Sequence, residues 1–150
     1  MSVIKHKAQR VAVLIDVQTM YHSAKNLHNA RVNFKEIVKT AVAGRELVRA
    51  IGYVIRTEAG DEKSFLEALI KMGIETRIKD LQVFAGGVKK ADWDVGMAID
   101  AVRLAHNGFV NAVVLVTGDG DFIPLVEYLQ AQGIQAEVMA FTRSASQKLQ

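Results

Sequence analysis

The 150-residue sequence contains no cysteine, which excludes disulfides and thiolate metal sites and fits a reducing compartment. We therefore expect a cytoplasmic protein. Proline occurs once, and half of the residues are hydrophobic, so an ordered fold is favoured over disorder. No apolar run approaches the ~20 residues that span a bilayer, and the N-terminal "MSVIKHKAQR" lacks the apolar segment of a secretory signal. These absences predict a globular protein with no membrane segment.

Excess charge is also scarce, because the formal net charge is only +3. Any cationic surface for nucleic acid must therefore be local. Lys89 and Lys90 precede an acidic helical pattern, and Arg56 lies near the end of a strand-like run, so these three are candidates for binding phosphates. The alternative is that they are ordinary solvated surface residues.

Strand-like and helical patterns alternate along the whole chain. Apolar or alternating runs predict strands at 10–16, 47–57, 74–80, 111–119 and 134–141. Helical spacing predicts helices at 20–28, 33–44, 61–73, 91–108 and 121–133. This alternation predicts a parallel sheet covered on both faces, an α/β fold of one domain over 1–150. A basic N-terminal extension at 1–9 and a polar tail at 142–150 would flank its core.

The segment "LQVFAGG" at 81–87 is harder to assign. It could extend the strand at 74–80 or pair with it. It is also a candidate edge for pairing with a second copy of the chain, which would give a homodimer.

Aspartates follow both fully apolar runs. Asp16 ends "VAVLID", while Asp119 and Asp121 follow "VVLVT" in "VTGDGDF". In parallel α/β sheets, ligands bind outside the carboxyl ends of the strands, near the switch point of the strand order. If the two strands are neighbours, three carboxylates meet at one edge and need a compensating cation. Taken singly, Asp16 and Asp121 are equally explained as caps of the helices that follow.

The helical pattern at 92–106 adds a fourth acid. At 100° per residue, Asp94 lies near the middle of the apolar arc, whereas Asp100 and Arg103 lie on the opposite, polar side. An acid on a core-facing stripe needs a cation, a donor or a raised pKa. The alternative places Asp94 in the first turn behind an Asp92 N-cap. We expect Asp100 to be a solvated partner of Arg103.

A cluster of Asp16, Asp94, Asp119 and Asp121 suits a hard divalent cation better than zinc, so Mg²⁺ or Mn²⁺ is the expected cofactor. One or two such ions position water, lower its pKa and stabilise charge on a reacting phosphodiester. The spacing alone is not specific, because Asp-x-Asp pairs occur in many folds.

The segments "VAVLIDVQTMY", "KKADWDVGMAIDA" and "VLVTGDGDFIPLVEYLQAQGIQAEV" together resemble the NYN domain, in its LabA/DUF88 branch of the PIN-like nuclease superfamily. The likeness spans nearly the whole chain and keeps the order of the motifs. It implies a three-layer α/β/α sandwich with a five-stranded, mainly parallel sheet of order 3-2-1-4-5. The implied activity is metal-dependent cleavage of RNA, that is, an endoribonuclease.

The resemblance also assigns roles to particular residues. It makes Asp16, Asp94, Asp119 and Asp121 catalytic and metal-binding, with Thr117 in the hydroxyl position of the [ST]GDxDF motif. Asp100 matches a second helix acid and is implied to be a supporting residue. The family's first motif usually reads D-x-x-N, but here Thr19 occupies the asparagine position. A threonine has a shorter reach than asparagine, so this departure bears on activity more than on fold.

The sequence leaves three other functions to compare with this one. A non-catalytic RNA-binding or regulatory module that keeps the pocket is favoured by Thr19. A haloacid-dehalogenase-like phosphatase is suggested by "DVQT", but Gln18 replaces the second acid that serves as general acid in that chemistry. Dinucleotide binding is disfavoured because no glycine-rich loop follows the first strand.

Overall fold

The computed structural model describes residues 8–17, 34–56, 63–80, 82–83, 89–90, 94–117 and 122–140. Within these ranges, the side chains of residues 55–56, 63–65, 80, 82–83, 89–90, 94 and 140 are outside the description. The helix expected at 20–28 and the tail expected at 142–150 lie outside the described residues.

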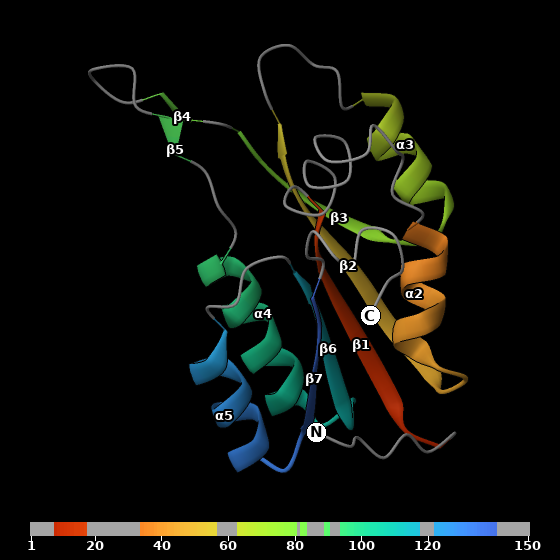
Figure 1. The fold of residues 1–150 in the computed structure, drawn as a ribbon, viewed down its shortest axis with the longest axis vertical. Helices are drawn as coiled ribbons and strands as arrows, with labels where there is room; N and C mark the ends of the chain where they lie inside the picture. The colour runs from red at the N-terminus through yellow and green to blue at the C-terminus, as the bar shows by residue number, and fades with distance from the viewer. Residues whose placement is uncertain are drawn as a thin grey trace.

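Five strands form one parallel sheet (Figure 1). They are β1 (Arg10–Asp16), β2 (Glu46–Arg56), β3 (Glu75–Asp80), β6 (Ala112–Thr117) and β7 (Gln135–Ala140). Their spatial order is β3-β2-β1-β6-β7, and each neighbouring pair is parallel. Counted along the chain, this is the order 3-2-1-4-5, so the predicted topology is confirmed.

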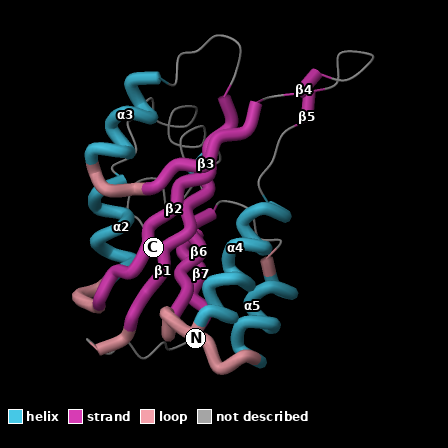
Figure 2. The backbone as a smooth tube through the Cα atoms, turned by 180° about the vertical axis from the view of Figure 1, so that it is seen from behind, coloured by secondary structure: helices cyan, strands magenta, loops and turns pink. Residues whose placement is uncertain are grey.

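Two pairs of helices cover the sheet, which makes the three expected layers. Helices α2 (Phe34–Val42) and α3 (Lys63–Lys71) lie on one face, and α4 (Asp94–Asn107) and α5 (Ile123–Ala131) lie on the other (Figures 1 and 2). Each face has its own apolar core cluster. None of the helices in the described part of the chain is long and apolar enough to cross a membrane.

The central strands explain why the sheet needs both helical layers. Every residue from Val11 to Ile15 in β1 is fully buried, and all six residues of β6 are buried. Strands buried on both faces read as continuous β-branched and apolar runs, as these two do. The helices that cover them end at glycines in the left-handed region, such as Gly73 (φ 83°) and Gly133 (φ 79°), where a side chain would be strained.

A short antiparallel pair lies apart from the main sheet. Strand β4 (Gln82–Val83) pairs with β5 (Lys89–Lys90), and Figure 1 shows this pair projecting beyond the five strands. The expectation that 81–87 pairs with the strand at 74–80 is therefore wrong for Gln82 and Val83. Their partners are Lys90 and Lys89, which lie shortly before the acidic helix in the sequence.

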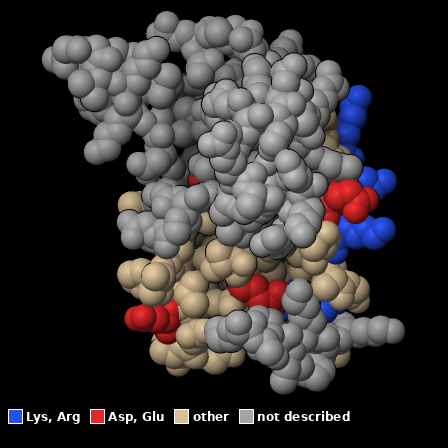
Figure 3. All heavy atoms as spheres, viewed as in Figure 1, with Lys and Arg blue, Asp and Glu red and all other residues tan. Residues whose placement is uncertain are grey.

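The outer surfaces of the two helical layers differ. Exposed positions on α2 and α3 are largely charged, and Figure 3 shows blue and red spheres along the edge where Figure 1 draws these helices. On α4 and α5, by contrast, Val95 is 70% exposed and Ile123 is 65% exposed. Ile70 of α3 is 60% exposed, so the outer side of the first pair is not free of apolar residues, but the second pair exposes more of them.

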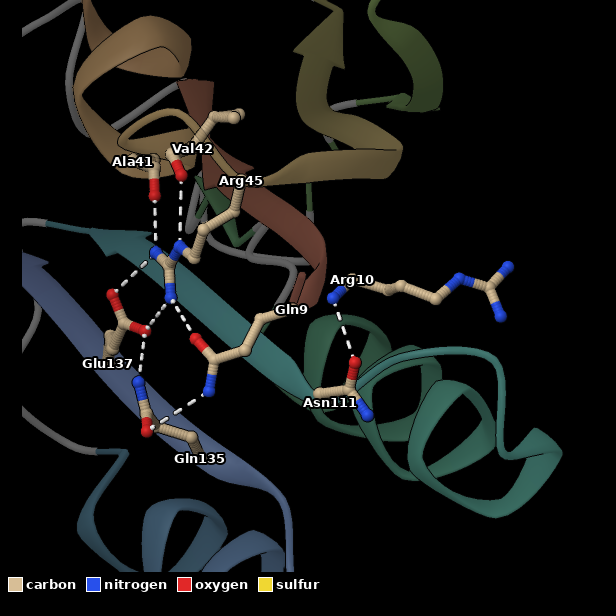
Figure 4. A network of polar contacts seen from close by, with 8 residues as sticks. All are labelled: Gln9, Arg10, Ala41, Val42, Arg45, Asn111, Gln135 and Glu137. Carbon is tan, nitrogen blue, oxygen red and sulfur yellow. Dashed lines mark hydrogen bonds and ion pairs between the residues drawn. The ribbon is translucent and has the colours of Figure 1, made fainter. Parts of the chain in front are cut away.

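At the amino end of the sheet, a buried ion pair joins distant strands (Figure 4). Arg45 precedes β2 and its side chain is fully buried, while Glu137 lies on β7 and its side chain is 8% exposed. The Arg45 guanidinium donates to both Glu137 carboxylate oxygens, at 2.6 and 3.0 Å. It also donates to the carbonyls of Ala41 and Val42, at 2.7 and 2.9 Å, and so caps the C-terminal end of α2.

Two glutamines complete this network. The Gln9 Oε1 accepts a hydrogen bond from Arg45 Nη1 at 3.2 Å, and Gln135 Nε2 donates to Glu137 Oε2 at 3.0 Å. One charge-paired group therefore links the starts of β1, β2 and β7 with the end of α2, as Figure 4 shows.

Candidate active site

The carboxyl ends of β1 and β6 define the centre of the candidate site. These neighbouring strands run parallel, with Ile15 opposite Val116, so their last residues, Asp16 and Thr117, lie next to each other. From β1 the chain continues to one side of the sheet, through β2 and β3, and from β6 it continues to the other, through β7. Ligands in such sheets bind at this switch point. The expectation that the strands preceding Asp16 and Asp119 are neighbours is confirmed.

Asp16 is held in a buried position. Asp16 is 7% exposed, and its neighbour Thr117 is 1% exposed. Thr117 Oγ1 donates a hydrogen bond to Asp16 Oδ2 at 3.5 Å. Gly52 contributes to this placement, because a Cβ there would lie 3.0 Å from Val17 Cγ2, directly after Asp16. The missing side chain makes room for Val17 beside β2. A carboxylate so deeply buried is costly unless donors or a cation stabilise its charge.

Asp16 belongs to a polar row that crosses the sheet on the side covered by α4. In register, Arg77 of β3 lies opposite Tyr53 of β2, and Tyr53 lies opposite Asp16 of β1. Thr117 continues the row on β6. Alternate residues of a strand share a face, and Leu14, Ile51 and Leu115 pack with α4 and α5, so their alternates Asp16, Tyr53 and Thr117 face the same helices.

Helix α4 contributes Asp100 to this row. The Asp100 residue is 8% exposed, and its Oδ2 accepts a hydrogen bond from the Tyr53 hydroxyl at 2.7 Å and pairs with Arg77 Nε at 2.8 Å. Burial raises the pKa of the Tyr53 phenol far above its ordinary range, and both the hydrogen bond to Asp100 and the negative charge of Asp100 add to that rise.

Two expectations for α4 are therefore wrong. Asp100 is not a solvated partner of Arg103 but a buried residue bound to two strands. The apolar arc around Asp94, expected to face the core, does not do so as a whole: its part with Met97, Ala101 and Leu104 packs on the sheet, whereas Val95 and Ile99 are 70% and 47% exposed. The sequence carries two apolar sectors on this helix, and its periodicity could not say which one meets the sheet.

The remaining predicted site residues are placed only in part. Asp94 is the first residue of α4, Arg56 is the last residue of β2, and Lys89 and Lys90 form β5, all without described side chains. Asp119, Asp121 and Thr19 lie outside the described residues. Within the ranges that the structure does describe, no group of three or more His, Cys, Asp or Glu side chains could hold a metal ion.

The described part of α5 begins after an N-cap at Phe122, which makes no side-chain capping hydrogen bond, and Pro124 lies in the first turn as expected. Asp121, for which the alternative was an N-cap of this helix, lies outside the described residues.

Tyr53 and Arg77 are not among the predicted site residues. Both lie in predicted strands, at 47–57 and 74–80, but nothing in the local pattern shows that β2 places Tyr53 beside Asp16. The usable signal was the strand order, because register across neighbouring strands brings residues of different segments into one row.

A hollow of about 540 Å³ opens between α4 and α5 on the outer side of the helical layer. Its lining is mainly apolar, with one charged residue, and is made up of Val95, Ala98, Ile99, Val102, Arg103, Phe122, Pro124 and Leu125. Among the described residues, no carboxylate lines this hollow.

The fold and the row at its switch point define a class: a doubly wound parallel α/β protein with a buried carboxylate at the ligand-binding edge of the sheet. Residues 10–150 match the NYN domain family. The chain belongs to the NYN domain family, within the PIN-like nuclease superfamily, so the family expected from the motifs is confirmed.

Named relatives are similar over most of the chain. The protein "Low amplitude and bright protein LabA" of Synechococcus elongatus is 27% identical over 143 residues, which cover 89% of this chain and 75% of LabA. The protein MJ0482 of Methanocaldococcus jannaschii is 29% identical over 141 residues, covering 94% of this chain. The chain spans about half of that archaeal relative, 51% of its length.

A solved structure supports the same fold. The crystal structure of VPA0982 from Vibrio parahaemolyticus, a protein described as of unknown function, superposes with a TM-score of 0.76 at 30% sequence identity. The match covers 91% of this chain and 83% of that one.

Proposed function

We propose that this chain is a divalent-metal-dependent endoribonuclease that hydrolyses RNA phosphodiester bonds. Asp16, Asp94, Asp119 and Asp121 would hold one or two ions, Mg²⁺ or Mn²⁺. The observation that carries the proposal is the position of Asp16, a buried carboxylate at the carboxyl end of β1, beside Thr117 at the strand-order switch point. NYN domains generally bind nucleic acid, and PIN-like nucleases generally use divalent metals.

The donor atoms fit a hard cation. Asp16 offers a carboxylate and Thr117 a hydroxyl, and the chain has no cysteine that would favour a softer metal. A bound divalent ion would supply a lowered pKa for attacking water and stabilisation of negative charge on the phosphate. Thr117 would orient the Asp16 carboxylate through its hydrogen bond, and Lys89, Lys90 and Arg56 would bind substrate phosphates.

The test is cleavage of end-labelled RNA by purified chains in the presence of Mn²⁺. We expect Asp16→Asn and Asp119→Asn each to reduce cleavage by at least about 100-fold, because each removes a negative charge that the ion requires. Glu36→Gln is the matched control, since Glu36 is an exposed acid in the first turn of α2, away from the site. Unchanged cleavage by both aspartate variants would end this assignment.

Thr19 supports a second candidate, an RNA-binding or regulatory module that does not cleave. In that case, labelled RNA binds to the chain but is not turned over at any Mn²⁺ concentration. The slope of binding affinity against salt concentration then reports how many phosphates are contacted. Replacing Thr19 with asparagine separates the two candidates further, because it restores the usual motif and should raise cleavage only if the site is catalytic.

A further inference from the structure

Asp100 makes polar contacts between α4 and the strands β2 and β3. Its Oδ2 receives the Tyr53 hydroxyl from β2 and Arg77 Nε from β3, at 2.7 and 2.8 Å, and the residue is 8% exposed. The other buried residues on this face of the helix, Met97, Ala101 and Leu104, are apolar. Apolar packing depends little on direction, so it tolerates small rotations and shifts of α4. The hydrogen bond and the ion pair of Asp100 do not tolerate them.

A buried and paired charge of this kind adds little net stability, but it favours one orientation of the helix over others. Pairing it roughly offsets the cost of removing it from water, but leaving it unpaired is expensive. Moving α4 by a single residue would rotate it by about 100° and shift it by about 1.5 Å along its axis. Either change would separate Oδ2 from at least one donor, so the pair of contacts specifies how α4 sits on the sheet.

The donors belong to the same row as the candidate metal ligand. Tyr53 is the register neighbour of Asp16, and Arg77 is the register neighbour of Tyr53. Asp94 begins α4 six residues before Asp100, about 9 Å along the helix axis. Asp100 thus links α4, which starts at Asp94, to Tyr53 on β2, and Tyr53 lies next to Asp16 on β1.

We propose that Asp100 is a positioning residue: together with Tyr53 and Arg77 it fixes the rotation and axial position of α4, and so sets Asp94 relative to Asp16 for metal binding. This inference rests on the proposed metal site. Asp100 then acts through α4 and not as a metal ligand. Tyr53 and Arg77, which lie outside the family motifs quoted above, hold Asp100 in place.

The experiment measures the Mn²⁺ affinity of the full chain by calorimetry, without substrate. Tyr53→Phe keeps the buried ring and removes only the hydroxyl, Asp100→Asn keeps the shape and removes the charge, and Arg77→Gln changes a residue on the edge strand. We expect each to weaken Mn²⁺ binding by about 10- to 100-fold, as is typical when groups that orient metal ligands are removed. Arg77→Lys, which keeps the charge, should fall between Arg77→Gln and the unchanged chain.

Arg49→Gln is the matched control. Arg49 pairs with Glu75 at 2.8 Å on the same two strands, and within the described residues it makes no hydrogen bond or ion pair with α4, although its charge acts on Asp100 and Tyr53 from a distance. Its loss should leave Mn²⁺ affinity unchanged. The double variant Tyr53→Phe with Asp100→Asn should bind Mn²⁺ about as weakly as the weaker single variant, because residues that act as one unit are not additive.

Amide hydrogen exchange of α4 in the metal-free chain provides a second readout. We expect faster exchange along α4 in the Tyr53, Asp100 and Arg77 variants and no change in Arg49→Gln. If the unchanged chain binds no Mn²⁺, the proposed metal site is wrong and the positioning role fails with it. If it binds Mn²⁺ and the three variants bind equally well, the metal site stands and the positioning role alone is overturned.

Discussion

The amino and carboxyl ends of the five-stranded sheet both contain buried carboxylates, held by different kinds of partner. At the amino end, a guanidinium binds Glu137 through two contacts of 2.6 and 3.0 Å and also caps α2. At the carboxyl end, Asp16 accepts a hydrogen bond from a neutral hydroxyl at 3.5 Å, beside Asp100 with its phenol and its guanidinium. The network around Arg45 therefore stabilises the fold, whereas the polar row lies at the end of the sheet where parallel α/β proteins bind their ligands.

This difference follows from the direction of the strands. In a parallel sheet all strands begin at the same end of the sheet and finish at the opposite end, so different connecting segments lie at the two ends. Here Arg45 comes directly after α2 and reaches across β1 and β6 to β7, whereas Asp16 and Thr117 end their strands at the switch point. Charge at the amino end is neutralised within the chain. At the carboxyl end, Asp100 is paired with Arg77, whereas Asp16 is 7% exposed and accepts a hydrogen bond from a neutral hydroxyl.

The largest effect on stability should come from breaking the amino-end pair. Arg45→Ala removes the cation while leaving Glu137 buried, so we expect a loss of about 3–5 kcal/mol in the free energy of unfolding. Urea denaturation measures this. Mn²⁺ affinity of the folded protein should be unchanged, and a parallel loss of metal binding would contradict the separation between the two ends.

Replacing both members of that pair sharpens the comparison. Arg45→Met combined with Glu137→Leu removes both buried charges and retains apolar volume, so we expect the double variant to be several kcal/mol more stable than Arg45→Ala. The α2 carbonyls lose their caps, which keeps the double variant from exceeding the unchanged chain by much. Equal destabilisation in the two variants would show that capping, not charge pairing, is the main role of Arg45.

The carboxyl end should respond to alkaline pH. The pKa of Tyr53 is raised in the folded chain, so the unfolded chain releases that proton first. The stabilising contribution is complete below the ordinary tyrosine pKa near 10 and is lost above it, at about 1.4 kcal/mol per pH unit. Tyr53→Phe should flatten this alkaline limb of a stability–pH profile. Tyr128→Phe, at a partly exposed position on α5, is the control and should leave the limb in place.

The smallest effect should come from the exposed pair between Arg49 and Glu75. The hydrogen bond from Arg49 lowers the pKa of Glu75, so its contribution is present above the ordinary glutamate pKa near 4.3 and is lost as pH falls through the lowered value. Because both side chains are more than a third exposed, we expect Glu75→Gln to cost under about 1 kcal/mol at pH 7. High salt should reduce that difference, and a cost above about 2 kcal/mol would show a buried role.

Much of the fold was accessible from local patterns. The strands predicted at 10–16 and 111–119 contain the apolar runs 11–15 and 112–116, and such runs identify strands buried on both faces, which the structure confirms as β1 and β6. Helix ends were also accessible, because Gly73 and Gly133 follow the last turns of α3 and α5. The strand order came from the family motifs, since periodicity does not encode which strands are neighbours.

The environment of Asp100 was not accessible in this way. Its polar neighbour in the helical pattern is Arg103, and an i,i+3 pair on a solvated face was the simplest interpretation. The partners that bury it, Tyr53 and Arg77, lie 47 and 23 positions earlier in the chain. Only the register of β2 and β3 and the docking of α4 bring the three together.

By itself, the sequence determined the five strands of the main sheet and the helices that cover it in the described part of the chain, and that aspartates follow the two most apolar strands. These properties depend on residues close together in the chain, through side-chain periodicity and the conformations that glycine permits. The tertiary structure decided which face of α4 meets the sheet, which acid the guanidinium of Arg45 neutralises, and which residues share a row with Asp16. Those properties depend on strand register and helix docking, which bring together groups far apart in the sequence.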